Sequence, residues 1–132
     1  MKLKGYITSK SFLGERVPQH IQNIIIRDYC DKNKYDFLLS ATEYSIPEST
    51  LMIKQIISEL DLIDGIVAYS IFQLPENLEV RFDLIHKIIG LRKQIHFACE
   101  NMKITNDNEF AKIENIWQIK QIMNFENLKG DK

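Results

Sequence analysis

Short apolar runs alternate with longer amphipathic segments along the whole chain. The apolar runs at 2–8, 35–44, 64–72 and 94–100 have the length and the flanking polar residues of β-strands. The run at 64–72 is apolar almost throughout, which is typical of a strand that is buried on both faces. The pattern therefore predicts a sheet of four to five strands.

Between these runs, apolar residues recur at intervals of three and four, which predicts four amphipathic helices. Pro18 suits the first turn of the first helix, where a missing N–H costs nothing, and Pro47 begins the second. The third helix should end near Gly90, and the last should cover about 106–124. The residues expected to face the core are, helix by helix, Ile21, Ile24, Ile25 and Tyr29; Ile53, Ile56, Ile57 and Leu60; Leu78, Phe82, Ile85 and Ile89; and Ile113, Ile116, Trp117 and Met123.

The regular alternation of strands and helices predicts an α/β fold with a mostly parallel sheet flanked by helices and a C-terminal helix. We expect one domain over residues 1–125 and a flexible tail at 126–132. Ligands of such sheets bind beyond the carboxyl ends of the strands. The loops at 8–19, 40–47, 70–77 and 100–103 are therefore the places where functional chemistry is expected.

Composition excludes several classes of protein. The 132 residues carry a net charge of −1, without the basic excess of a nucleic-acid-binding protein. No run approaches the roughly 18 apolar residues of a membrane span, so we expect a cytoplasmic protein. Cys30 and Cys99 lie far apart and should be free thiols. His20, His86 and His96 share no metal-ligand spacing, so we expect packed or surface histidines and no metal site.

The first loop combines hydroxyl, amide and cationic side chains: Ser9, Lys10, Ser11, Arg16 and Gln19. Lysine and arginine close to the start of a helix suit an anionic ligand such as a phosphate or a carboxylate. The alternative is a solvated polar loop. The sequence contains neither GxGxxG nor GxxxxGK[ST], so we expect no nucleotide cofactor, and we expect no other cofactor either.

The remaining loops add carboxylates. Ser40, Glu43 and Tyr44 follow the second predicted strand, and a carboxylate beside a tyrosine can serve proton transfer. Capping of a local turn is the alternative for these residues. Gln73, after the third strand, can read an amide or a hydroxyl, and Glu100 ends the fourth strand.

The spacing of several motifs resembles the catalytic domain of the serine recombinases, that is, the resolvases and invertases. The motifs are Gly5-Tyr6 in the first strand, Gln22 in the first helix, Arg-Asp-Tyr at 27–29, and a strand that runs into Glu100. The resemblance covers about residues 2–103 and implies a fold like that of the resolvase catalytic domain.

The departures from this pattern argue against recombination. The resemblance implies an arginine where Thr8 stands, a nucleophilic serine at Lys10, and two arginines at Gln73 and Glu76. Phosphoryl transfer relies on positive charge placed around the phosphate oxygens, and a glutamate works against it. We therefore expect no nucleic-acid partner.

A denser resemblance is to a bacterial family called sporadic carbohydrate cluster proteins. The segments that carry it are GYITSKSFLGERVPQHIQN, RDYC, LLSATEY, DGIVAYSIFQLPEN, IHFACENMKI and KIENIWQ. The resemblance implies a place among the proteins of surface-polysaccharide biosynthesis. It implies a pathway and no particular reaction.

Taken together, these observations predict an enzyme of the isomerase, epimerase or lyase type that acts on a sugar, sugar phosphate or nucleotide sugar. Lys10 and Arg16 would bind the anionic end, and Glu43 with Tyr44 or Glu100 would move the proton. The side chains expected to read hydroxyl groups are Ser9, Ser11, Gln19, Ser40 and Gln73.

Two alternatives remain open. One is a non-catalytic partner of a carbohydrate-biosynthesis enzyme, marked by an exposed apolar patch near Trp117. The other is a degenerate recombinase-like module that acts on DNA. The last helix carries apolar residues on more than one side, so we also expect a homodimer, without contact to a membrane.

Overall fold

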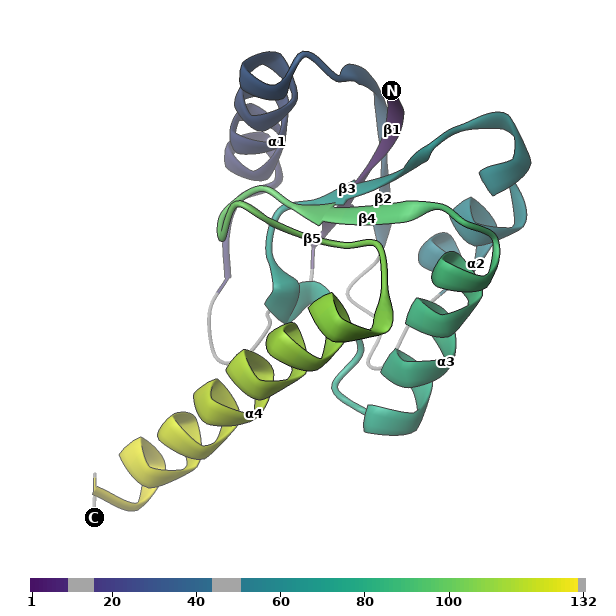
Figure 1. The fold of residues 1–132 in the computed structure, drawn as a ribbon. Helices are drawn as coiled ribbons and strands as arrows, with labels where there is room; N and C mark the ends of the chain where they lie inside the picture. Colours follow the sequence, from purple (N-terminus) through teal and green to yellow (C-terminus); the bar gives the residue numbers. More distant parts are fainter. Residues whose placement is uncertain (10–15, 44–50, 131–132) are drawn as a thin grey trace.

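The structure is a computed structural model of the chain, and we describe residues 1–9, 16–43 and 51–130, with side chains through Met123 (Figure 1). The elements, in chain order, are β1 (Lys2–Thr8), α1 (Gln19–Asn33), β2 (Asp36–Glu43), α2 (Leu51–Ser58), β3 (Gly65–Ala68), α3 (Leu78–Gly90), β4 (Gln94–Phe97), β5 (Met102–Ile104) and α4 (Asp107–Gly130). Two short 3-10 turns, η1 (Leu60–Leu62) and η2 (Ile71–Gln73), flank β3.

The five strands form one sheet in the order β2-β1-β3-β4-β5. The first four strands are parallel, and β5 runs antiparallel to β4. The predicted α/β class with a mostly parallel sheet is confirmed. The strand order reverses between β1 and β3, so the carboxyl ends of these two strands form the switch point where open α/β sheets bind ligands.

Helices cover both faces of the sheet. On one face, Ile26 and Tyr29 of α1 pack against Leu3, Ile7 and Val67 of the central strands. On the other face, α2, α3 and the first turns of α4 build the larger core around β1, β3 and β4. In Figure 1, α1 lies across the sheet from α2 and α3, while α4 runs away from the sheet toward the C-terminus.

A bulge in β2 depends on Gly5. Lys4 pairs with Leu38 and Tyr6 pairs with Ala41, so two residues of β2 stand opposite this one glycine. A Cβ atom at Gly5 would lie 2.2 Å from the Ser40 Oγ. The glycine therefore lets the two strands approach closely beside the switch point.

The buried faces of three helices differ from the predicted ones. In α1, Ile21 and Ile24 are exposed, whereas Gln22 and Ile26 are buried. The cause is that Gln22 satisfies polar groups of the backbone inside the protein, which periodicity alone does not reveal.

The face of α3 is shifted in the same way. Leu78 and Phe82 are about half exposed, because the buried Arg81 takes the interior position next to them. In α4, Ile113 and Trp117 are buried as predicted, but Ile116 and Met123 are exposed. The predicted face of α4 was therefore too wide.

The ends of the later strands and helices also differ from the predicted ends. The predicted fourth strand stops at Phe97, and the unpredicted β5 follows after a tight turn. α4 continues to Gly130, beyond its predicted end at 124. Among the described residues, no helix combines the length and the apolar character that a membrane crossing requires.

Candidate functional site

The switch point is occupied by a pair of buried glutamines. Gln22 of α1 and Gln73 of η2 are almost fully inaccessible to solvent, and the Gln73 Nε2 donates to the Gln22 Oε1 at 2.7 Å. Gln22 also accepts from the Thr8 N–H and donates to the carbonyls of Thr8 and Val17. The side-chain oxygen of Gln73 accepts from the N–H groups of Tyr69 and Ser70.

These contacts join α1, the end of β1 and the end of β3 into one polar network. The two amides bond to each other and to the backbone of all three segments. Gln73, predicted to read a substrate, thus holds the turn after β3 in place. Gln22 was noted only through the resemblance to the serine recombinases; a glutamine near the start of an amphipathic helix, three positions after Gln19, was the available signal.

Glu43, at the end of β2, is completely buried and lies against the start of α2. Its Oε2 accepts from the hydroxyl of Tyr6 at 2.9 Å and from the backbone N–H groups of Met52 and Ile53 at 3.2 and 3.3 Å. A helix leaves its first N–H groups without intrahelical partners, and a carboxylate there is favoured by the helix dipole. This arrangement is that of a capping carboxylate.

The electrostatics of Tyr6 agree with that role. Burial, together with the adjacent charge of Glu43 and the hydrogen bond to it, raises the pKa of the Tyr6 hydroxyl far above its usual value. Tyr6 therefore stays protonated and serves as a donor. Tyr6 was not among the predicted site residues, although it stands in the Gly5-Tyr6 motif.

Glu100 closes a second small network at the end of β4. Its Oε2 accepts from the Ser70 hydroxyl at 2.7 Å, and its Oε1 accepts from the Ile71 N–H at 2.8 Å. The Ser70 oxygen in turn accepts from the Phe72 N–H, which makes Ser70 the cap of η2. Glu100 is partly exposed, so of the two predicted carboxylates it is the one that solvent reaches.

The other predicted site residues lie in different surroundings. The Ser9 N–H and hydroxyl both donate to the Glu43 carbonyl, which continues the pairing of β1 with β2. The Ser40 hydroxyl donates to Asn23 of α1 at 2.7 Å. Arg16 and Gln19 are exposed at the start of α1, which has no side-chain cap.

The structure thus brings Ser9 to Glu43, and Gln73 and Glu100 to Ser70. Lys10, Ser11 and Tyr44 lie outside the described residues, so their predicted roles stay predictions. Within the described part of the chain, no three His, Cys, Asp or Glu side chains gather where they could hold a metal ion.

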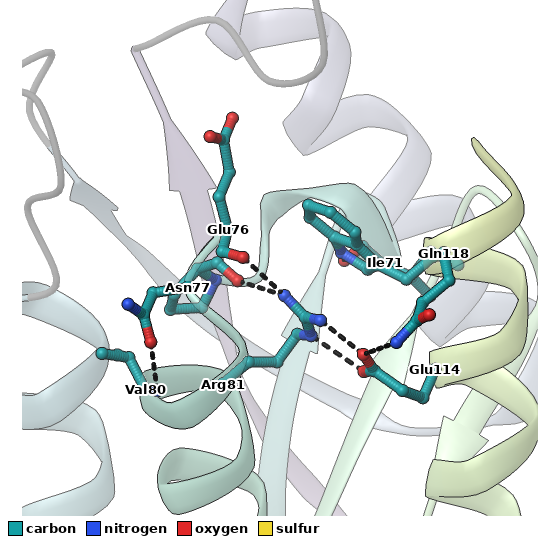
Figure 2. A network of polar contacts seen from close by, with 9 residues as sticks. Ile71, Glu76, Asn77, Val80, Arg81, Glu114 and Gln118 are labelled. Atoms are coloured by element: carbon teal, nitrogen blue, oxygen red, sulfur yellow. Dashed lines mark hydrogen bonds and ion pairs between the residues drawn. The ribbon is translucent and has the colours of Figure 1, made fainter. Parts of the chain in front are cut away.

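A separate polar network anchors α4 (Figure 2). The buried Arg81 of α3 forms a two-pronged ion pair with Glu114 of α4 and donates to the carbonyls of Pro75 and Glu76 at 2.8 and 3.0 Å. The ring of Trp117 lies under the guanidinium at 4.3 Å. The hydrogen bond from Arg81 holds the pKa of Glu114 below its usual value, although partial burial opposes this.

The Trp117 indole N–H donates to the Ile71 carbonyl at 3.1 Å. Together with Arg81, this bond ties α4 to the turn after β3, close to Ser70 and Gln73. From Ile116 onward the exposed side of α4 carries an apolar stripe, which consists of Ile116, Ile119, Ile122 and Met123. The stripe leaves a large apolar surface next to an anchored helix.

His96, in the middle of β4, is fully buried and lies in an aromatic cluster with Tyr29 and Tyr35. Its Nδ1 lies 2.6 Å from the Tyr29 hydroxyl, and its Nε2 lies 2.9 Å from the Gln94 Oε1. Burial, aided by the charge of Lys103, lowers the pKa of His96 to about 4. The imidazole is therefore neutral at pH 7, which matches the expected packed histidine. Cys30 and Cys99 are free thiols, as expected.

Comparisons with known proteins show the fold. No described protein family matches the sequence, and no curated protein matches it. The N-terminal catalytic domain of TP901-1 integrase is similar in structure, with a TM-score of 0.64 and 11% identity over 98% of this chain and 99% of that domain. A resolvase family site-specific recombinase from Streptococcus pneumoniae has a TM-score of 0.65 and 7% identity over 97% of this chain and 95% of its own. These likenesses confirm the predicted resolvase-like fold.

Proposed function

We propose that the protein is a non-catalytic partner of a carbohydrate-biosynthesis enzyme, built on a resolvase-like fold. The observation that carries this proposal is the buried Gln22–Gln73 pair at the switch point, where a sheet of this type would bind its ligand. The proposed link to carbohydrate metabolism comes from the sequence resemblance alone.

The contacts of Glu43 support the same conclusion. A general base must reach the proton that it removes from a substrate. Glu43 is fully buried, and its carboxylate accepts hydrogen bonds from Tyr6, Met52 and Ile53. Because Glu43 caps α2, it is poorly placed to remove a proton from a substrate.

The exposed apolar stripe on α4 bears on the oligomeric state of the protein. Monomeric proteins rarely leave a contiguous apolar surface of this kind on a projecting helix. We propose that two copies of the chain pair through their stripes. Ile119→Glu with Ile122→Glu should convert a dimer into a folded monomer in light scattering, while Lys112→Glu with Lys120→Glu, on the same helix, should not. A monomeric parent protein would contradict this pairing.

The experiment that tests the non-catalytic role uses a strain of the native host that lacks the gene. Variants with Arg16→Ala or Glu100→Gln change exposed or partly exposed predicted site residues with little effect on the core. Both should restore surface polysaccharide to the level of the parent protein. Loss of restoration by either variant, with the protein folded and present at normal levels, would point to an enzyme.

An enzyme that acts on a sugar phosphate is the second candidate. Arg16 and Gln19 are exposed at the start of α1, whose N-cap Pro18 makes no side-chain capping bond, and a helix N-terminus beside a cation favours an anion. A rise in melting temperature with a sugar phosphate or a nucleotide sugar, absent in Arg16→Ala, would establish such a site.

A DNA-acting module is favoured only by the fold. At the positions where the resemblance implies arginines, the described residues include buried Thr8 and buried Gln73. A gel shift with duplex DNA that weakens steeply with salt would support this candidate, because each phosphate contact releases counterions. We expect no shift.

A further inference from the structure

A groove runs between α3 and α4 on the outside of the protein. It consists of two adjoining cavities of about 530 and 290 Å³, which share Leu78, Phe82 and Glu114. Neither cavity borders the switch point. The groove is therefore a feature separate from the candidate site.

The floor of the groove is apolar, and its aromatic ring is packed against neighbouring rings. Leu78 is 50% exposed and Phe82 is 49% exposed, although both lie on a helix that is anchored in the core. The ring of Phe82 stacks on His86 with centroids 3.9 Å apart and contacts Phe110 of α4. An aromatic ring held in place at the surface is a typical anchor point for a protein partner.

The rim of the groove is negative. Glu79 and Asp83 stand one turn apart on α3, an arrangement that destabilises a helix by mutual repulsion. Within the described part of the chain, neither forms an ion pair. The nearby cation Arg81 is already bound to Glu114 and to the carbonyls of Pro75 and Glu76 (Figure 2).

The other polar side chains near the groove already have partners within the protein. His86 donates toward the Phe82 carbonyl through Nδ1, and its Nε2 lies 3.2 Å from Asp107. Glu114 is matched by Arg81. What the groove presents to a partner is thus an apolar floor with two carboxylates along one side that form no ion pair with the described residues.

We propose that this groove binds an amphipathic helix of a partner protein, with apolar side chains on Leu78, Phe82 and Phe110 and with lysine or arginine opposite Glu79 and Asp83. The inference rests on the proposed non-catalytic role and names the chemistry of the partner. Opposite charge along the rim favours this occupant and steers its approach.

The groove and the apolar stripe adjoin each other on α4. Glu114 and Gln118 line the groove, and Ile122 of the stripe stands one turn after Gln118 on the same side of the helix. A second copy on the stripe would therefore be a neighbour of a partner helix in the groove.

The test uses the full chain and two designed, fluorescently labelled helical peptides. Both carry leucines at helical spacing; one has lysine at its polar positions, and the other has glutamate. Anisotropy should show the lysine peptide binding at least about tenfold more tightly than the glutamate peptide. Phe82→Ala, and Glu79→Lys with Asp83→Lys, should each weaken the lysine peptide about tenfold or more.

The matched control is Glu59→Lys with Asp61→Lys, which changes the net charge equally at exposed positions outside the groove. It should leave the affinity within about twofold. Equal weakening by this control, or no binding of the lysine peptide, would overturn the proposal. Light scattering that shows a dimer dissociated by Phe82→Ala would also overturn it, because a second copy would then occupy the groove.

Failure of this test and failure of the proposed function are distinguishable. If the lysine peptide does not bind while Arg16→Ala and Glu100→Gln still restore polysaccharide, only the assignment of the groove is wrong. If those two variants lose restoration, the non-catalytic role itself is wrong.

Discussion

The Nε2 of Gln73 donates to the Oε1 of Gln22 at 2.7 Å, between a helix on one face of the sheet and the turn that follows the central strand. This bond links segments that are 51 positions apart in the sequence. It lies where a doubly wound sheet would bind a ligand. The same bond thus joins two distant segments at the edge of the sheet where ligands of such folds bind.

Gln22→Met should lower the free energy of unfolding by roughly 2–4 kcal/mol, because it removes four hydrogen bonds from a buried position and keeps the side-chain volume. Gln73→Met should cost a similar amount. Denaturant unfolding of both variants and of the double variant gives the coupling between them. The double variant should lose less free energy of unfolding than the two single variants together, by about 1 kcal/mol or more. If the two losses simply add, the bond between the two side chains contributes nothing.

Tyr6→Phe should destabilise the protein by roughly 1–3 kcal/mol, because the buried carboxylate of Glu43 loses a donor. Glu43→Gln should also destabilise it, through the start of α2. The comparison variant is Ser58→Ala, which removes an exposed hydroxyl bound to its own helix. Chemical denaturation that finds Glu43→Gln as stable as the parent protein would contradict the capping role.

Arg81→Lys should cost roughly 3 kcal/mol, since lysine keeps the charge but cannot reproduce the two-pronged pair with Glu114. Trp117 is the sole tryptophan and lies against the guanidinium, so its fluorescence reports the loss locally. Arg92→Lys, on the exposed turn after α3, is the control. An unchanged emission spectrum would mean that Arg81 does not position α4.

Stability should fall as the pH drops from 6.5 toward 4, because of His96. Its pKa is about 4 in the folded protein, against the usual 6.5 of a solvated histidine, so the unfolded chain binds the proton first. The contribution is fully present above pH 6.5 and declines by up to about 1.4 kcal/mol per unit below it, about 3 kcal/mol in all.

The control for this pH dependence is His20→Gln, which changes an exposed histidine. His96→Gln should flatten the stability profile between pH 6.5 and 4, whereas His20→Gln should leave its slope unchanged. If an NMR titration finds the pKa of the His96 imidazole near 6.5, the side chain is not buried as described.

Acid should also weaken the Arg81–Glu114 pair that anchors α4, at a lower pH than the range in which His96 acts. The pKa of Glu114 is held below its usual 4.5 by the hydrogen bond from Arg81, so this contribution is present above pH 4.5 and is lost as the pH falls through the folded value. Below pH 4.5, the free energy of unfolding of Glu114→Gln should depend less on pH than that of the parent protein. Asn115→Ala, at an exposed position next to Glu114 on the same helix, is the control and should leave the slope of the parent protein unchanged.

Much of the fold follows from local pattern. The boundaries of β1 and α1 agree with the prediction, since the apolar run at 2–8 and the proline at 18 are local signals. Alternation of strands and helices was sufficient for the α/β class and the mostly parallel sheet. The strand β5 was missed because its three residues are too few to show an alternating pattern, although it pairs with β4, which directly precedes it.

The sequence indicated which polar residues lie near the strand ends, but it did not indicate what each side chain binds. Proximity to strand ends correctly brought Glu43, Gln73 and Glu100 to the same edge of the sheet. Whether each one is free to meet a ligand depends on partners far away in the sequence. Tyr6 and the start of α2 satisfy Glu43, while Ser70 and Ile71 satisfy Glu100.

The sequence by itself determined the class of the fold, the order of its elements and the edge at which polar side chains gather, because periodicity and turn residues act over a few positions. The fold alone places Gln22 and Arg81 in the interior and Phe82 at the surface. It also supplies the donors that bind the carboxylates of Glu43 and Glu100 within the protein. The physical reason is that burial of a polar group is permitted only where distant segments supply its hydrogen-bond partners, and no local pattern records which segments meet.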